Sequence, residues 1–146
     1  MRRGKPAQTS ERGAAAVEFA LVLPVLIVMI FGMVDMGMAI NAQAIVGNAA
    51  REGARAASFS GADTTATNNA ISRASASLIG TAPTTNITCQ TMVSGTPTAI
   101  ACSSVSPGDS VQVKVSYTYK WITPGVLGLP GQSVIVATSQ MRIESA

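Results

Sequence analysis

The chain has 146 residues, 47% of them apolar and only 12% charged, with a formal net charge of +3 at pH 7. Four of its ten basic residues precede residue 13, and the rest of the chain balances six basic against six acidic residues, which leaves no basic surface for a nucleic acid. It has no histidine, no GxxxxGK motif and only two cysteines, so we expect no enzyme, no cofactor, no metal site and no nucleic-acid partner.

Residues 14–34 form the first predicted element, an apolar run that carries a single charge. A helix of this length, at about 1.5 Å per residue, spans the ~30 Å hydrocarbon core of a bilayer. Because basic residues stay on the cytoplasmic side, we expect residues 1–13 to be a cytoplasmic basic leader and the chain after Val34 to face outward. A cleaved secretory signal ending at the A-x-A sequence of residues 42–44 is the alternative, but its apolar region is usually only ~7–15 residues long.

Glu18 is the single charge inside this apolar run. A carboxylate within a membrane helix costs on the order of 2–3 kcal/mol at the centre of the bilayer and less near an end, and such residues are by default functional candidates. The alternative is that Glu18 lies only about one turn inside the membrane and reaches back to the interface without a role.

Two stretches resemble a known family. "RGAAAVEFALVLPVLIVMIFGMVDMG" is similar to the processing and membrane motif of the TadE-like pseudopilins of the tight-adherence (Tad) pilus, a branch of the type IVb pilins, and "NAAREGARAAS" is similar to its continuation. The resemblance covers about residues 12–58. It implies that a prepilin peptidase cuts after Gly13, that Ala14 becomes the first mature residue, and that Glu18 is the fifth.

The resemblance also gives Glu18 a physical role. Cleavage after Gly13 creates an α-amine on Ala14, which is positive near neutral pH. When membrane helices pack side by side with an axial stagger, the carboxylate of one subunit meets the amine of the next, and pairing offsets the cost of both charges in a low-dielectric setting. The implied partners are prepilin peptidase, other pilin and pseudopilin subunits, and inner-membrane pilus assembly proteins.

Beyond the membrane segment, residues 35–58 are expected to continue the helix into the periplasm. Three small residues, Ala49, Gly53 and Ala57, follow one another at intervals of four, so they share a face that another element can approach closely. Residues 59–146 are expected to form a small periplasmic α+β domain.

That domain is predicted to begin with a second helix, capped by Asp63 or Thr64 and ended by Gly80. Its buried stripe is expected to comprise Thr67, Ile71, Ala74 and Leu78. Strands follow, the clearest being "SVQVKVSYTYKW", in which apolar and polar residues alternate, and a last strand is expected in "SVIVATSQMRI". The strand aromatics Tyr119 and Trp121 are expected to lie in the core, the alternative being that they form a binding platform. We expect these strands to form a small antiparallel sheet packed on the helices.

Cys89 and Cys102 are predicted to form a disulfide, since an even number of cysteines outside the cytoplasm favours pairing. If the chain folds back at Gly95-Thr96 in a type II′ turn, the two cysteines lie opposite each other on neighbouring strands, at a distance that a disulfide spans. A four-residue turn over residues 94–97 keeps the same opposition. Two separate buried thiols are the alternative.

The predicted fold is therefore type IV pilin-like: a long N-terminal membrane-spanning helix that continues outward, a second helix, and a small antiparallel sheet. The resemblance implies a minor pilin or pseudopilin of the bacterial inner membrane that is cleaved by prepilin peptidase and acts in assembly of a Tad-type adhesion pilus. The alternative is an uncleaved bitopic inner-membrane protein whose periplasmic domain binds a partner.

Overall fold

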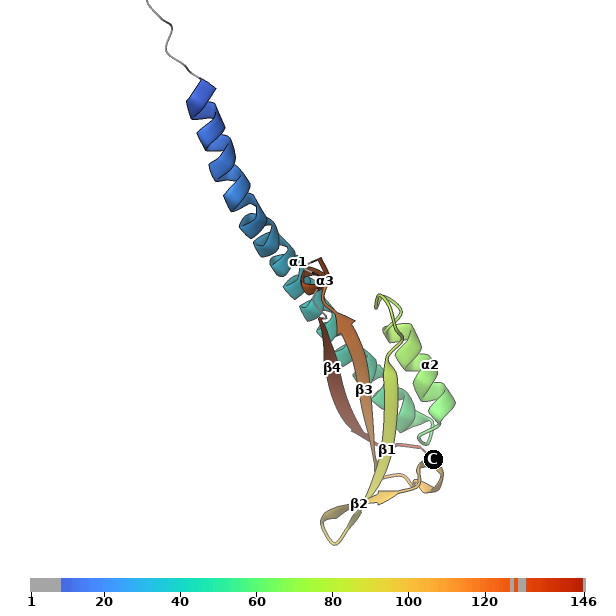
Figure 1. Cartoon of the computed structure of the whole chain (residues 1–146). Coiled ribbons are helices and arrows are strands. Elements are labelled where there is room, and N and C mark those ends of the chain that lie inside the picture. The colour runs from blue at the N-terminus through green and yellow to red at the C-terminus, as the bar shows by residue number, and fades with distance from the viewer. Residues whose placement is uncertain (1–8, 127, 129–130, 146) are drawn as a thin grey trace, which may run out of the picture.

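A computed structural model describes residues 9–126, 128 and 131–145 of the chain, so most of the predicted basic leader lies outside the described residues. The elements, in chain order, are α1 (Thr9–Phe59), α2 (Thr64–Ala74), β1 (Thr84–Val93), β2 (Thr96–Ile100), the 3-10 turn η1 (Cys102–Ser104), β3 (Ser110–Lys120), α3 (Ile122–Val126) and β4 (Gln132–Arg142). Figure 1 shows α1 projecting far beyond a small domain formed by its second half, α2 and the sheet. This is the α+β class predicted from the sequence.

The four strands form one antiparallel sheet in the order β2-β1-β3-β4. Along β3 the odd-numbered residues from Val111 to Tyr119 are buried, whereas the even-numbered residues are exposed or half-buried. Successive side chains of a strand point to opposite faces, so this alternation gives the sheet one face against the helices and one facing solvent. The alternation seen in the sequence therefore identified the buried face correctly.

The helix α1 is continuous through Pro24, and its two halves have different surroundings. In the second half, the side facing the sheet and α2 is buried and consists mostly of small residues. The buried members of α1 are Asp35, Ala42, Val46, Ala49, Ala50, Gly53, Ala54, Ala57 and Ser58. Alanine and glycine allow the axis of α1 to lie close to its neighbours. The predicted stripe of Ala49, Gly53 and Ala57 therefore packs against α2 and the sheet of the same chain.

Gly53 marks the tightest approach along this stripe. A Cβ atom built on Gly53 would lie 2.6 Å from Cγ1 of Ile71 on α2 and 3.2 Å from Cγ1 of Val113 on β3. Real Cβ atoms do not approach another carbon to 2.6 Å, so any larger residue must displace the Ile71 side chain or push α2 away from α1.

We expect Gly53→Ala to destabilise the domain by about 1–2 kcal/mol, because overpacking costs ~1–3 kcal/mol and the better helix propensity of alanine returns up to about 1 kcal/mol. Gly47→Ala is the matched control, since a Cβ there meets only the Arg51 side chain, at 4.0 Å. Denaturant unfolding of both variants measures the difference. Equal stability of the two variants would contradict the close approach at Gly53.

The second helix is shorter than the sequence predicts. Asp63 caps it as expected, because its carboxylate accepts hydrogen bonds from the amides of Thr65 and Ala66, both at 3.1 Å. The helix ends at Ala74, however, and not at Gly80. Ser75 donates both its amide and its hydroxyl to the carbonyl of Ile71, at 2.9 and 2.7 Å, and such back-bonding competes with continuation of the helix.

The sequence predicted that Leu78 belongs to the buried stripe of α2. This prediction was wrong, because α2 ends four residues before Leu78. Leu78 follows the helix in an irregular segment and is half-buried against the core. Thr67 and Ile71 are the buried residues of α2 itself. The apolar side chain of Leu78 therefore predicted correctly that this residue packs against the core, but it did not show that the residue lies in a helix.

The hairpin between β1 and β2 turns at Ser94 and Gly95, one residue earlier than predicted. Val93 pairs with Thr96, and both turn residues have positive φ, 53° and 83°, as a type I′ turn requires. The predicted turn at Gly95-Thr96 would be closed by the amide of Pro97, and proline has no N–H. The observed turn instead places Thr96, which has an N–H, at the closing position.

The change of register moves Cys89 opposite Ile100, so the predicted opposition of the two cysteines across the strands was wrong. The disulfide itself forms as predicted, with the two Cα atoms 5.2 Å apart. Cys102 lies in η1, just beyond the end of β2, where the chain curls back toward β1. The bridge therefore ties the end of the hairpin to the sheet.

Candidate membrane and assembly site

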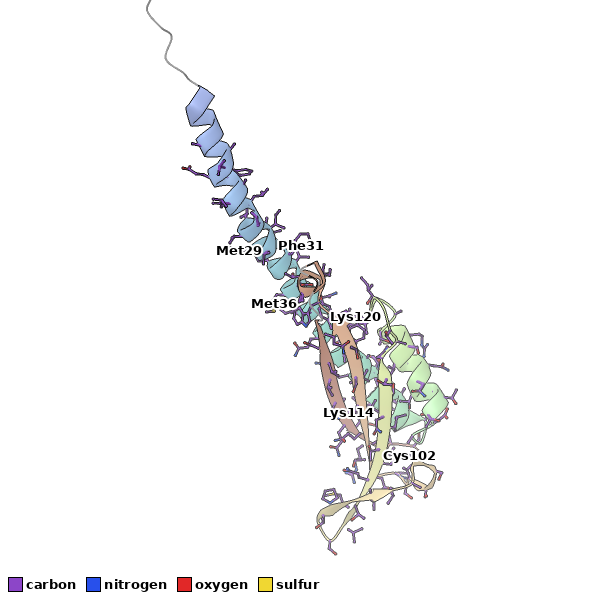
Figure 2. All side chains as sticks on the ribbon, viewed as in Figure 1. Met29, Phe31, Met36, Cys102, Lys114 and Lys120 are labelled. Carbon is purple, nitrogen blue, oxygen red and sulfur yellow. A yellow bond between two sulfur atoms is a disulfide. The ribbon has the colours of Figure 1, made fainter. Side chains whose placement is uncertain are left out.

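Among the described residues, no element covers the first half of α1. Every residue from Gly13 to Val34 is exposed, and Leu21, for example, exposes 72% of its surface. Figure 2 shows the Met29 side chain pointing away from the helix with no other element beside it, whereas Phe31 lies near the end of the stem, where α3 begins to approach. An apolar helix of this length, with Glu18 as its single charge, is long enough to cross a membrane. We call residues 13–34 the stem.

The predicted processing residues lie at the start of the stem. Because α1 begins at Thr9, the bond between Gly13 and Ala14 lies inside the helix. A Cβ on Gly13 would meet nothing within 4 Å, so this position is open on all sides. Glycine also weakens a helix by up to about 1 kcal/mol relative to alanine, which makes the predicted junction a soft point.

Ala14 and Glu18 are four residues apart on a continuous helix, and they therefore share a face. Both are exposed. The cysteines lie at the opposite end of the molecule: Figure 2 places Cys102 near the tip farthest from the stem. The structure thus places the predicted processing and pairing residues at one end of the molecule and the disulfide near the other.

Asp35, immediately after the stem, is a site that the sequence did not reveal. Only 2% of its surface is exposed, and its carboxylate accepts hydrogen bonds from the amides of Ile122, at 2.9 Å, and Thr123, at 2.6 Å. The hydroxyl of Tyr119 donates to the same carboxylate at 3.4 Å and to the Asp35 carbonyl at 3.3 Å. Asp35 therefore fastens the end of β3 and the start of α3 to the point where α1 leaves the domain.

The charge of Asp35 is stabilised by these donors. Burial opposes ionisation, but the hydrogen bonds from Thr123, Ile122 and Tyr119 outweigh it and hold the pKa of Asp35 below its usual range. Burial, and then the negative charge of Asp35, raise the pKa of Tyr119. Tyr119 also meets Trp121 edge to face, with ring centroids 5.1 Å apart. Tyr119 thus lies in the core as predicted, whereas Trp121 is only half-buried beside it.

No local sequence signal identifies Asp35 as a clamp. Its partners are 84 to 88 residues away in the chain, and only the fold brings them together. As the first charge after an apolar run, Asp35 reads only as the end of a membrane segment.

We expect Asp35→Ala to release α3, seen as faster hydrogen exchange at the Ile122 and Thr123 amides. Acid should act in the same direction: because the pKa of Asp35 is lowered by folding, its contribution is complete above the ordinary carboxyl pKa of 3.8 and is lost as the pH falls through the lower folded value. Asp109→Ala is the control, since Asp109 accepts a hydrogen bond from the Ser106 amide in a different turn. Unchanged exchange at α3 in Asp35→Ala would contradict the clamp.

Among the described residues no three histidine, cysteine or acidic side chains come close enough to hold a metal ion. Within the described residues, the exposed apolar stem, the helix that carries it into the domain, and the four-stranded sheet define a small α+β domain borne on an N-terminal apolar helix that is long enough to cross a membrane.

Within this class, residues 13–55 match the family model described as TadE-like protein. The chain thus carries a TadE-like segment, which confirms the resemblance found in its sequence. The matched segment contains the whole stem and most of the rest of α1. No curated protein and no solved structure matches the chain.

Proposed function

We propose that this protein is a minor pilin or pseudopilin that is cut by prepilin peptidase after Gly13 and then takes part in assembly of a Tad-type adhesion pilus. The observation that carries the proposal is the stem: an apolar helix that is exposed on every side, yet continuous with the core helix of a folded domain. Such a helix is suited first to a bilayer and then to a bundle of similar helices, because both environments cover apolar surface without requiring a change of fold.

The proposed orientation rests on the two ends of the molecule. The basic residues of the chain's first segment precede the stem, and basic segments stay in the cytoplasm. The disulfide between Cys89 and Cys102 lies in the domain after the stem, and disulfides persist in oxidising compartments such as the periplasm. We therefore place the N-terminus in the cytoplasm and the α+β domain in the periplasm, with the stem as the single crossing of the inner membrane.

The proposed assembly contact joins Glu18 of one subunit to the new α-amine on Ala14 of another. Within one helix these residues share a face, so a neighbouring helix shifted along its axis by about four residues, or ~6 Å, brings amine and carboxylate to one level. Pairing of both charges in an apolar bundle satisfies each of them and fixes the axial register.

Cleavage is tested by the N-terminus of the membrane-bound protein. We expect intact mass or N-terminal sequencing to give Ala14 as the first residue. Gly13→Leu should keep residues 1–13 attached, whereas Gly32→Leu, at an equally open glycine of the same stem, should be cut as in the wild type. A mature chain that starts at Met1 would favour an uncleaved bitopic protein, and one that starts after Ala44 would favour a secretory signal.

A further inference from the structure

The end of the domain that faces the stem carries apolar side chains that the fold leaves uncovered. They come from separate elements: Met36 on α1 is 56% exposed, Ile79 after α2 is 85% exposed, and Ile122 at the start of α3 is 44% exposed. Lys120, the last residue of β3, is exposed beside them. We call Met36, Ile79, Lys120 and Ile122 the basal surface.

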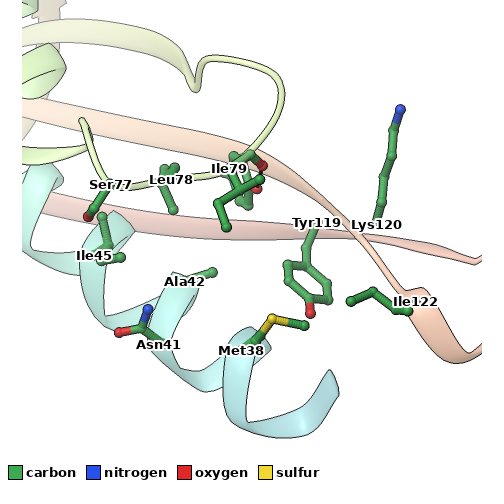
Figure 3. A pocket seen from close by; sticks show the side chains of 11 residues that line it. Met38, Asn41, Ala42, Ile45, Ser77, Leu78, Ile79, Tyr119, Lys120 and Ile122 are labelled. Carbon is green, nitrogen blue, oxygen red and sulfur yellow. Dashed lines mark hydrogen bonds between the residues drawn. The ribbon is translucent and has the colours of Figure 1, made fainter. Parts of the chain in front are cut away.

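A partly open cavity of about 190 Å³ lies behind the basal surface. Figure 3 shows Ile79 and Ile122 on either side of Tyr119, with Met38 and Ala42 of α1 across from them. The cavity is smaller than the ~300–1,000 Å³ of a typical small-molecule site and is lined mostly by apolar groups, so it suits a short length of hydrocarbon better than a polar metabolite.

The charges around this surface favour an anionic partner. On α1 no charged residue occurs between Asp35 and Arg51, and the carboxylate of Asp35 is buried against amide donors. Lys120 therefore supplies the exposed charge here, and Figure 3 shows its side chain pointing away from Tyr119 and from the cavity. An apolar hollow with a cation at its outer side matches an amphiphile that has hydrocarbon at one end and a phosphate at the other.

The position of the basal surface identifies the source of such an amphiphile. Met38 stands four residues beyond Val34, or about 6 Å along the helix axis. The polar layer of a bilayer adds about 5–8 Å on each side of its hydrocarbon core. If the stem spans the membrane as proposed, the base of the domain lies within this polar layer, and Trp121 beside Lys120 is at the depth where interfacial aromatic residues gather.

We infer that the basal surface docks onto the periplasmic face of the bilayer and binds an anionic phospholipid there. Ile79 and Ile122 contact the upper carbons of the lipid at the mouth of the cavity, and Lys120 pairs with its phosphate. This inference rests on the proposed placement of the stem in the membrane. Its consequence is that the domain is held against the membrane until the subunit leaves for the pilus.

Trp121 is the single tryptophan of the chain, so its fluorescence reports on this surface alone. The full chain is reconstituted into phosphatidylcholine vesicles with or without phosphatidylglycerol, each carrying a nitroxide quencher near the headgroup end of the acyl chain. We expect phosphatidylglycerol to increase quenching of Trp121 at least about twofold. Lys120→Ala and Ile79→Ser should each remove most of this increase.

Two control variants match these changes. Lys114→Ala removes an exposed lysine from the same strand, farther from the stem, and Met92→Ser removes an exposed apolar residue from the distal hairpin, and both should behave as the wild type. Equal quenching in both lipids, or equal effects of test and control variants, would overturn the inference. Resistance of the protein to alkaline extraction, measured on the same vesicles, separates the two proposals: a chain that extracts contradicts both, whereas a retained chain with unchanged quenching contradicts only the docking of its base.

Discussion

Glu18→Ala is expected to leave membrane insertion and cleavage intact and to prevent assembly into pili. Removing a charge from an apolar helix makes insertion more favourable, so the variant should reach the membrane at wild-type levels. In the family that the stem resembles, the peptidase reads chiefly the glycine at the junction, so processing after Gly13 should continue.

The loss appears when subunits join. After cleavage, the amine of a neighbouring Ala14 enters an apolar bundle without its carboxylate partner, and an unpaired charge in such a setting costs ~3–5 kcal/mol. This cost is a factor of more than a hundred in an association constant. Glu18→Gln should be intermediate, because the amide still accepts a hydrogen bond but carries no charge.

Two measurements on the same cells separate processing from assembly. Immunoblot mobility of the membrane fraction reports cleavage, and recovery of sheared pili or cross-linking to pilus subunits reports assembly. Phe19→Ala serves as the control, since it alters the adjacent and equally exposed position without removing a charge. If Glu18→Ala assembles as well as the wild type, the carboxylate merely reaches the membrane interface and the pairing is wrong.

Replacing both cysteines with alanine is expected to destabilise the domain by roughly 3 kcal/mol. The bridge joins residues separated by 13 positions, and in the chain-entropy model a closed loop of about this size contributes about 3 kcal/mol by restricting the unfolded chain. Alanine is chosen because Cys89 is fully buried, and a serine hydroxyl there would add a desolvation cost of its own.

The effect should be concentrated in the distal hairpin. There β2 pairs only with β1, whereas β3 is held by strands on both sides and by α1. Denaturant unfolding of the double variant against the wild type, each with and without reductant, measures the loss, and the double variant should no longer respond to reductant. Mass spectrometry of unreduced wild-type protein that found two free thiols would contradict the bridge itself.

The stem is an example of a structural feature that can be predicted from consecutive residues alone. A run of apolar residues long enough to cross a bilayer, with basic residues before it, needs no tertiary contact to be recognised, because its signal is composition summed over consecutive positions. Strand β3 is a second example, because the alternation of apolar and polar residues from Val111 to Tyr119 predicted which face of the sheet is buried. The helix cap at Asp63 is a third, because its hydrogen-bond partners are only two and three residues away.

The pairing register of β1 and β2 was harder to predict from the sequence, because small stereochemical differences in the turn decide it. The sequence predicted the β1–β2 turn at Gly95-Thr96, but Pro97 has no N–H to close a turn there, and the chain turns one residue earlier, at Ser94-Gly95. The prediction of the disulfide was correct despite the wrong register. Cys102 lies beyond the end of β2, so its position does not depend on strand pairing and its sulfur reaches Cys89. The end of α2 was likewise missed: the helix stops at Ala74, where the hydroxyl of Ser75 bonds back to the carbonyl of Ile71, and not at Gly80.

By itself, then, the sequence determined the long apolar N-terminal helix, the order of the two long helices and the strands, the buried face of the sheet and the pairing of the cysteines, although not the short helix α3. Only the tertiary structure decided what the small residues around Gly53 pack against, and that Asp35 is a clamp and not merely the end of an apolar run. Both depend on partners far along the chain, Val113 for Gly53 and Thr123 for Asp35. Patterns among residues that are close in the sequence do not predict such contacts, because only folding brings these distant residues within a few ångströms of each other.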